Sequence, residues 1–335
     1  MPIVVRNAQG EVLPPPCLRS RRPVPRLEAV ALCGCLLAAS IILILSREVK
    51  SNNDNNNGNI ASSVSHGHLP LLAARGAFAL TCLLCLRKTL TDNGLRLDTF
   101  YFVRYSQIRT SPLNVDFSGI HRVATFTVQS WLCITIFFTV AAIVSFCSAA
   151  GFPLDINERA FTVAFEVLFC ISMLVTFIVT YVLIPGHVLK GGDPADNPMF
   201  AFHPIILHNC NLLFLLTELC LANHTIDAND YPYGLVYIGW YAAFAQYFMY
   251  KHGVCFYPFV DPTLPPFLSF FFLSTFALVV FAVFKIGAAA TSQPMTLRRA
   301  AVLYMCALSI SCFRSNSGWM RFIQRLGRQS HRANK

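Results

Sequence analysis

The chain has 335 residues, of which 55% are hydrophobic and only 13% are charged, and its mean hydropathy is +0.54. A soluble domain carries about 25% charged residues, so this composition excludes an ordinary soluble enzyme. It also excludes a disordered chain, a coiled coil and a collagen-like fibre, and the long unalternating apolar runs exclude an outer-membrane barrel. The net charge is +10, but the basic residues flank apolar runs, which favours contact with anionic lipid over nucleic acid.

The first 26 residues form a basic, proline-containing tail that we expect to lie in the cytoplasm. The apolar run 27–45 follows this tail without a cleavage site of the A-x-A kind, so we interpret it as a signal anchor. A cleaved signal peptide or an organellar presequence is the alternative interpretation. The segment 51–59 is rich in asparagine and is typical of a solvated loop.

Seven further apolar segments predict helices that cross a bilayer. They cover residues 69–86, 123–149, 160–184, 202–222, 231–250, 267–287 and 300–313. The last segment is short, and a re-entrant or interfacial segment is the alternative there. We therefore predict an all-α, polytopic integral membrane bundle of about eight spans over 27–313. A basic tail over 314–335 follows it, either as a helix lying on the membrane surface or as a solvated tail.

The distribution of lysine and arginine predicts the orientation of the bundle. With eight spans, the cytoplasmic segments hold 19 of these residues and the loops on the opposite side hold 5. The positive-inside rule then places both termini in the cytoplasm. A seven-span arrangement would put the six cations of the C-terminal tail on the wrong side. We expect an endoplasmic reticulum or other endomembrane protein, with the plasma membrane as the alternative.

Polar residues inside the apolar segments are the first candidates for function, because a charge at the bilayer centre costs about 2.5–3.5 kcal/mol on insertion scales. These candidates are Thr125, Gln129, Glu166, His208, Asn211, Glu218, Gln246 and Lys285. The segment 202–222 is the richest, because His208 borders the helix face that Asn211 and Glu218 share. Such residues often only join helices, and a helical threonine commonly bonds its own i−4 carbonyl, so position alone does not assign chemistry.

Several familiar catalytic and metal-binding motifs are missing from the sequence. The nine histidines show no histidine-box spacing, and His203 and His208 are five residues apart, which serves zinc poorly. The chain has no G-x-S-x-G elbow and no phosphate-binding G-x-x-x-x-G-K loop. Most of the thirteen cysteines lie in apolar runs and are interpreted as packing residues, although Cys82 and Cys85 form a lone C-x-x-C. We therefore expect neither a metal nor a cofactor.

Four short motifs occur in a fixed order between residues 110 and 290. They are Thr125-Phe126 at the start of a span, His208 followed ten residues later by Glu218, Tyr231-Pro232 in a short loop, and Gly253-x-x-x-Tyr257-Pro258-Phe259 after the next span. In this order and spacing, the region resembles the androgen-induced gene 1 / androgen-dependent TFPI-regulating protein family. Cys255 stands where that family usually has tryptophan, and the N-terminal span, the asparagine-rich loop and the basic C-terminal tail are additional.

The resemblance implies a multi-span membrane hydrolase that cleaves fatty acid esters of hydroxy fatty acids. Carried over to this sequence, Thr125 is the nucleophile and His208 is the general base. Candidates for positioning the substrate or stabilising an oxyanion are Asn209, Asn211, Glu218, His252, Gly253 and Tyr257. The expected partners are the lipid bilayer, an amphiphilic lipid ester, and anionic lipid at the basic tails.

Three other functions stay open at this point. A transporter or channel would use Glu166, His208, Glu218 and Lys285 as a proton or ion path, although no inverted repeat is evident. A non-catalytic membrane scaffold needs none of these residues. An integral membrane acyltransferase would use the same histidine with a different acceptor.

Overall fold

The computed structural model describes most of the helical part of the chain. The described residues are 4–6, 12–13, 31, 34–45, 69–91, 95–101, 113–117, 119–185, 198–261, 264–313, 321–323 and 325. The predicted asparagine-rich loop 51–59 lies outside these residues, as does most of the predicted basic tail 314–335.

Each of the eight predicted apolar segments contains a helix. The helices are Gly34–Leu45, α2 Leu69–Thr91, α3 Phe126–Ala149, α4 Glu158–Ile178, α6 Phe202–Ile205, α7 Asn211–Leu221, α8 Tyr231–His252, α9 Pro266–Thr291 and α10 Leu297–Ile310. Two π-helical turns, Val179–Leu183 and Ile206–Cys210, extend α4 and join α6 to α7. Short 3-10 turns cover Gly119–Ala124, Pro198–Phe200, Ala228–Asp230 and Pro258–Val260.

Five helices in the described part of the chain are long and apolar enough to cross a membrane. They cover Leu69–Thr91, Phe126–Ala149, Glu158–Leu183, Phe202–Leu221 and Phe267–Thr291. The chain therefore has the character of a helical integral membrane protein, but the predicted count of about eight spans is not confirmed. The Gly34–Leu45 helix and α10 are shorter than the roughly 20 residues that a bilayer requires. Helix α8 has 22 residues, but Gln246, Lys251 and several tyrosines lower its hydropathy.

The chain forms two compact units that interleave along the sequence. Unit 1 contains residues 1–61, 87–129 and 227–289, and unit 2 contains residues 62–86, 130–226 and 290–335. The placement of one unit relative to the other is not determined. The region 110–290, which carries the four short sequence motifs, therefore contributes to both units.

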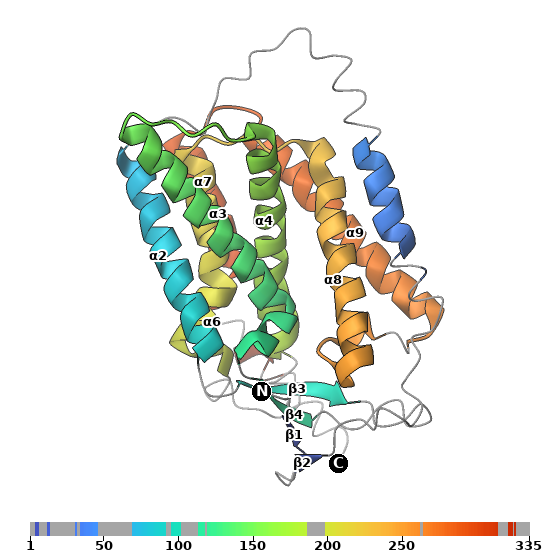
Figure 1. The fold of residues 1–335 in the computed structure, drawn as a ribbon. Helices are drawn as coiled ribbons and strands as arrows, with labels where there is room; N and C mark the ends of the chain where they lie inside the picture. The colour runs from blue at the N-terminus through green and yellow to red at the C-terminus, as the bar shows by residue number, and fades with distance from the viewer. Residues whose placement is uncertain are drawn as a thin grey trace. The chain divides into compact units, whose positions relative to one another are not determined.

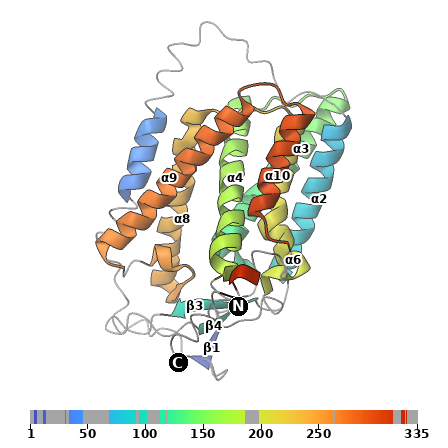
Figure 2. The ribbon, with the colours of Figure 1, turned by 180° about the vertical axis from the view of Figure 1, so that it is seen from behind.

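Unit 2 is a helical bundle built around α4. In Figures 1 and 2, α4 lies among α3, α6, α7 and α10. Helix α4 begins at a capped end, where the Asn157 side chain accepts the N–H of Ala160 at 2.9 Å. Phe137 of α3 stacks on Phe161 of α4 with ring centroids 4.7 Å apart. Such buried aromatic pairs hold the helices together and leave little free space in the bundle.

Unit 1 contains the Gly34–Leu45 helix, α8, α9 and a small β-sheet. Helix α8 has Pro232 in its first turn, where the missing N–H costs nothing, and it ends at Gly253, whose φ is 72°. Helices α8 and α9 touch closely at Gly234. A Cβ atom there would lie 2.9 Å from Val280 Cγ1 and 3.1 Å from Phe284 Cε2.

This close contact predicts that Gly234→Ala destabilises unit 1. Val280 and Phe284 are 0% and 1% exposed, so neither side chain has room to move away from an added methyl group. We expect the free energy of unfolding to fall by about 1–3 kcal/mol, as in other overpacked cores. Thermal unfolding of the full chain in detergent measures the change. Gly76→Ala is the matched control, because a Cβ atom there meets nothing within 4 Å. An unfolding temperature that is equal in the two variants would contradict this packing.

The sheet in unit 1 is a feature that the sequence analysis did not predict. Its strand order is β2-β1-β4-β3-β5, and every neighbouring pair is antiparallel. The strands are β1 Val4–Arg6, β2 Val12–Leu13, β3 Leu95–Tyr101, β4 Leu113–Phe117 and β5 Val254–Cys255. Strands β3 and β4 pair from Leu95 opposite Phe117 to Thr99 opposite Leu113. Because β5 follows α8 directly, the turn at Gly253 also brings the chain into the sheet.

Candidate active site

Thr125 lies in unit 1, one residue before the start of α3. Its side chain is 8% exposed, and its hydroxyl donates to the carbonyl oxygen of Arg122 at 3.2 Å. Its own carbonyl accepts the N–H of Gln129 at 3.0 Å, so Thr125 makes the first helical hydrogen bond of α3. Arg122 Nη1 donates in turn to the carbonyl oxygen of Thr89 at 2.7 Å. The predicted nucleophile is therefore a buried hydroxyl at a braced helix start.

Two tyrosine hydroxyls lie at the same helix start. The phenol oxygen of Tyr257 lies within hydrogen-bonding reach of the Thr127 side chain and of the backbone N–H groups of Phe126 and Thr127. The hydroxyl of Tyr241 donates to the carbonyl oxygen of Ala124 at 3.3 Å. Burial raises the pKa of Tyr257 to about 12, so its phenol keeps its proton at neutral pH. Because a helix N-terminus carries partial positive charge, this arrangement suits an oxygen atom that gains negative charge.

His252 and Gly253 lie at the end of α8 in unit 1. The N–H of Gly253 donates to the carbonyl oxygen of Met249 at 2.7 Å, so the end of the helix already uses this donor. The ring of His252 lies 5.8 Å from the ring of His121. Partial burial, followed by the nearby His121 and Lys251, lowers the pKa of His252 from its usual value. His252 is therefore a neutral side chain at physiological pH.

His208 lies in unit 2, on the π-helical turn Ile206–Cys210. Its side chain is 8% exposed, and its Nδ1 has no hydrogen-bond partner among the described residues. Nearly all buried polar atoms in folded proteins have such a partner, so this nitrogen is unusual. A neutral imidazole has one nitrogen that can accept a proton. Nδ1 of His208 can therefore accept or donate a hydrogen bond to a bound reaction partner.

The two asparagines next to His208 have structural partners. Asn209 Nδ2 donates to the carbonyl oxygen of Cys312 at 3.1 Å, while its Oδ1 has no partner in the described part of the chain. Asn211 Oδ1 accepts the backbone N–H of Leu212 at 2.7 Å. Both side chains are at most 2% exposed. Each of the two side-chain amides thus already has a hydrogen bond to a backbone group.

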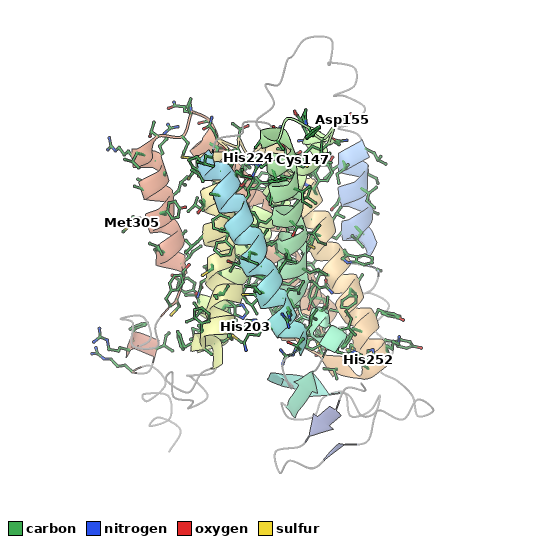
Figure 3. The ribbon with its side chains drawn as sticks, turned by 60° about the vertical axis from the view of Figure 1, so that its left-hand side comes forward. Cys147, Asp155, His203, His224, His252 and Met305 are labelled. Carbon is green, nitrogen blue, oxygen red and sulfur yellow. The ribbon has the colours of Figure 1, made fainter. Side chains whose placement is uncertain are left out.

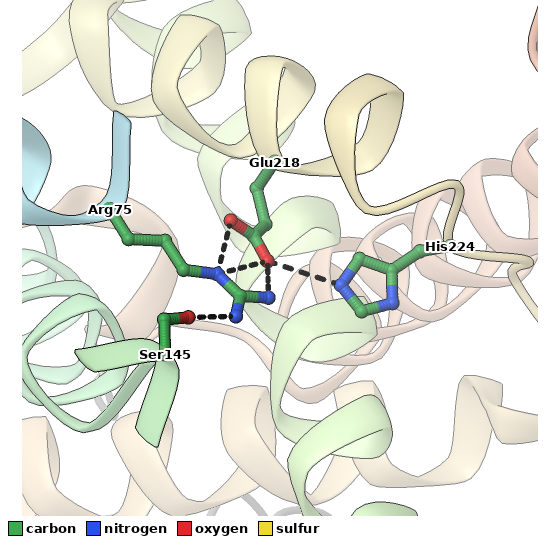
Figure 4. Close-up of polar contacts among 4 residues, drawn as sticks. All are labelled: Arg75, Ser145, Glu218 and His224. Carbon is green, nitrogen blue, oxygen red and sulfur yellow. Dashed lines mark hydrogen bonds and ion pairs between the residues drawn. The ribbon is translucent and has the colours of Figure 1, made fainter. Parts of the chain in front are cut away.

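Glu218 belongs to a buried ionic network in unit 2 (Figure 4). Arg75 Nε lies 3.1 Å from both carboxylate oxygens of Glu218, and Arg75 Nη2 also donates to this carboxylate. Arg75 Nη1 donates to Ser145 Oγ at 2.6 Å, and His224 Nε2 lies 3.3 Å from Glu218 Oε1. The His224 ring stacks on Phe165 with centroids 4.4 Å apart. Arg75 and Glu218 are 0% and 1% exposed, so each neutralises the other's charge away from water.

This network and the His208 turn lie at different places in unit 2. Figure 3 shows His203 and His224 at opposite ends of the unit 2 helices. His203 is close to His208 along the chain, and its Nε2 lies 3.2 Å from the carbonyl oxygen of Cys85. The ion pair of Glu218 with Arg75 therefore gives Glu218 a bracing role and leaves its carboxylate engaged.

The sequence analysis identified Glu218 but not its partners Arg75 and His224. The signal for Arg75 was present, because a lone arginine inside an apolar segment requires a counter-charge. Thr176, which bonds the backbone of His208, was also missed, because nothing in the sequence distinguishes it from other helical threonines.

The predicted catalytic residues thus fall into two groups, one in each unit. Thr125, Tyr257, His252 and Gly253 belong to unit 1, whereas His208, Asn209, Asn211 and Glu218 belong to unit 2. The pairing of Thr125 with His208 stays a prediction. Within the described residues, no group of three histidine, cysteine or acidic side chains is placed to hold a metal ion. Comparison of the chain with protein-family models, curated proteins and solved structures finds no match.

Proposed function

We propose that the chain is an integral membrane hydrolase of lipid esters, with Thr125 as nucleophile and His208 as general base. Fatty acid esters of hydroxy fatty acids are the proposed substrates, as the resemblance of the region 110–290 implies. The proposed location is the endoplasmic reticulum or another endomembrane, with both termini in the cytoplasm. The bilayer itself supplies the amphiphilic substrate.

One observation carries this proposal: the buried ring of His208 has an unpartnered Nδ1 on a turn that departs from the α-helix. Single π-helical turns inside helices occur frequently at functional sites. A buried polar atom without a partner is costly, so a protein that keeps one commonly uses it in binding or reaction. The buried hydroxyl of Thr125 at the N-terminus of α3 adds to the case.

The proposed reaction proceeds through an acyl-threonine. His208 takes the hydroxyl proton of Thr125 as the oxygen attacks the ester carbonyl carbon. The imidazolium then gives this proton to the departing alkoxide, so that the alcohol leaves and the acyl group stays on Thr125. His208 next takes a proton from water as the water oxygen attacks the acyl carbon, and it gives this proton to the Thr125 oxygen as the bond to the acyl group breaks and the fatty acid leaves. This chemistry requires the Thr125 oxygen and a His208 nitrogen to come within about 2.6–3.2 Å of each other.

Tyr257 is the proposed donor to the oxyanion. Its neutral phenol lies at the start of α3, within reach of the Thr127 side chain and of the N–H groups of Phe126 and Thr127. In the proposed reaction the phenol turns its proton toward the negative oxygen of the tetrahedral intermediate.

A covalent probe tests the nucleophile directly. We expect a fluorophosphonate to label the wild-type chain in membranes and to label Thr125→Ala at less than about a tenth of that level, because the attacking hydroxyl is gone. Thr125→Ser keeps a hydroxyl and is the matched control, for which we expect labelling and ester hydrolysis to persist. Equal labelling of Thr125→Ala and wild type would refute the assignment of this nucleophile. Ester hydrolysis that persists in the alanine variant would refute it as well.

The transporter or channel alternative needs an intramembrane acid or base that can exchange protons or ions. Glu218 is one such acid, and its carboxylate is bound by Arg75 and His224. An engaged carboxylate of this kind is more typical of a structural contact than of an ion path.

A further inference from the structure

Two side chains form hydrogen bonds with the backbone of the turn that carries His208. In an α-helix the N–H of Leu212 would bond the carbonyl oxygen of His208, four residues earlier. Here each of these backbone groups has a side-chain partner. The hydroxyl of Thr176 on α4 donates to the carbonyl oxygen of His208 at 2.7 Å, and Asn211 Oδ1 accepts the N–H of Leu212 at 2.7 Å. Both backbone groups are thus satisfied without a regular helical turn.

Thr176 and Asn211 form one buried pair. The Thr176 hydroxyl lies 3.4 Å from Asn211 Oδ1, and the two side chains are 0% and 1% exposed. The pair joins α4 to the start of α7 at the position of His208. Both side chains are closed off from water, so the loss of either one removes a hydrogen bond that water does not replace.

The hydroxyl of Thr176 bonds differently from the hydroxyls of Thr135 and Thr139. A helical threonine usually returns its hydroxyl to the carbonyl four residues earlier. Thr135 and Thr139 do so, bonding the carbonyl oxygens of Trp131 and Thr135 at 2.8 Å and 2.7 Å. The hydroxyl of Thr176 instead reaches a neighbouring helix. The contact of Thr176 with the His208 turn is therefore not the usual hydrogen bond of a threonine within its own helix.

We propose that Thr176 and Asn211 are positioning residues that hold the imidazole of His208 in its reactive orientation. This inference rests on the proposed hydrolase function, because the orientation matters for proton transfer from Thr125. Without the pair, the turn Ile206–Cys210 gains by closing into an α-helix. Adding or removing one residue from a helical turn rotates the side chains beyond it by about 100°. The ring of His208 then points in another direction.

The test compares Thr176→Val, which keeps the shape but lacks the hydroxyl, with Thr176→Ser, which keeps the hydroxyl. Hydrolysis of a defined fatty acid ester of a hydroxy fatty acid is measured with the full chain in proteoliposomes. Hydrogen exchange of the peptide 206–212 is measured on the same samples. We expect Thr176→Val to lower kcat by about 10–100-fold with KM changed less than about threefold, because misplacement costs rate more than binding. Exchange at 206–212 is expected to change in the same variant, and Thr176→Ser is expected to restore both quantities.

Thr135→Val is the matched control. Thr135 is also buried, at 3% exposed, and its hydroxyl donates to the carbonyl oxygen of Trp131 in the same helix. An equal loss of kcat in Thr135→Val and Thr176→Val would overturn the inference. Wild-type kcat with unchanged exchange in Thr176→Val would also overturn it. If the wild-type chain hydrolyses no ester, the proposed function fails. The exchange measurement alone then decides whether the pair holds the turn.

Discussion

Replacing Glu218 by leucine is expected to destabilise the protein strongly. The change leaves the guanidinium of Arg75 buried without a counter-charge, since Arg75 is fully buried and bonds both carboxylate oxygens. Breaking a buried ion pair by removing one partner costs about 3–5 kcal/mol. We expect a decrease of this size in the free energy of unfolding for Glu218→Leu, and a similar one for Arg75→Met.

The double variant Arg75→Met/Glu218→Leu is expected to recover most of this loss. It removes both charges together and fills the same space with apolar side chains, which is often neutral for stability in buried sites. Ser145 and His224 lose a partner in the double variant, so recovery is expected to be incomplete. The recovery separates the energy of an unpaired charge from the loss of packing around it.

Unfolding of the full chain in detergent, followed by tryptophan fluorescence, measures all three variants. Glu158→Leu is the control, because Glu158 is an exposed acid in the first turn of α4 and its loss is expected to cost at most about 1 kcal/mol. The bracing role of the network is refuted if Glu218→Leu unfolds like Glu158→Leu. It is also refuted if the double variant is less stable than both single variants.

The positions of the helices could be predicted from the sequence because backbone groups in a bilayer must bond within their own segment. An apolar run of about 20 residues therefore has few alternatives to a helix. The predicted number of spans is not confirmed, because 27–45 and 300–313 yield helices shorter than a span within the described residues. The run 231–250 was predicted to cross the bilayer because of its length, although its polar residues lower its hydropathy.

The sheet could have been predicted in part. The segments Leu95–Tyr101 and Leu113–Phe117 begin with alternating apolar and polar residues, as in Leu-Arg-Leu-Asp and Leu-Asn-Val-Asp. This period of two is the pattern of a half-buried strand. Each of these alternating stretches is only four residues long, much shorter than the apolar runs that predict the helices. The pairing of β4 with the N-terminal strand β1 is not readable from either segment, because it joins residues about a hundred positions apart.

For the candidate site, the sequence predicted single residues but not their partners. Glu218 stood out as a charge within an apolar segment, yet its partner Arg75 is 143 residues away along the chain. His208 stood out as well, but a π-helical turn has no known signature in hydropathy. The hydroxyl that fixes this turn comes from α4, 32 residues earlier. Contacts of this kind depend on how helices pack, which a pattern within one segment does not specify.

The largest effect on activity is expected from His208→Ala. If His208 is the general base, its removal lowers kcat for ester hydrolysis by about 10²–10⁴-fold, with a smaller change in KM. His203→Ala is the matched control, because His203 lies five residues earlier in the same unit and its ring contacts the carbonyl oxygen of Cys85. A kcat in His208→Ala within about twofold of wild type would refute the assignment, as would an equal loss in His203→Ala.

The structure also gives a way to separate lost chemistry from lost folding in this variant. Thr176 bonds the backbone carbonyl of His208, and Nδ1 of the ring has no partner in the described part of the chain. Removing the ring therefore leaves the bonds that brace the turn in place. We expect hydrogen exchange of residues 206–212 in His208→Ala to stay close to wild type while kcat falls. Added imidazole, which can enter the space of the missing ring, is expected to restore part of the rate. A loss of kcat that coincides with faster exchange, and that imidazole does not restore, would assign the effect to the fold of the turn rather than to the missing base.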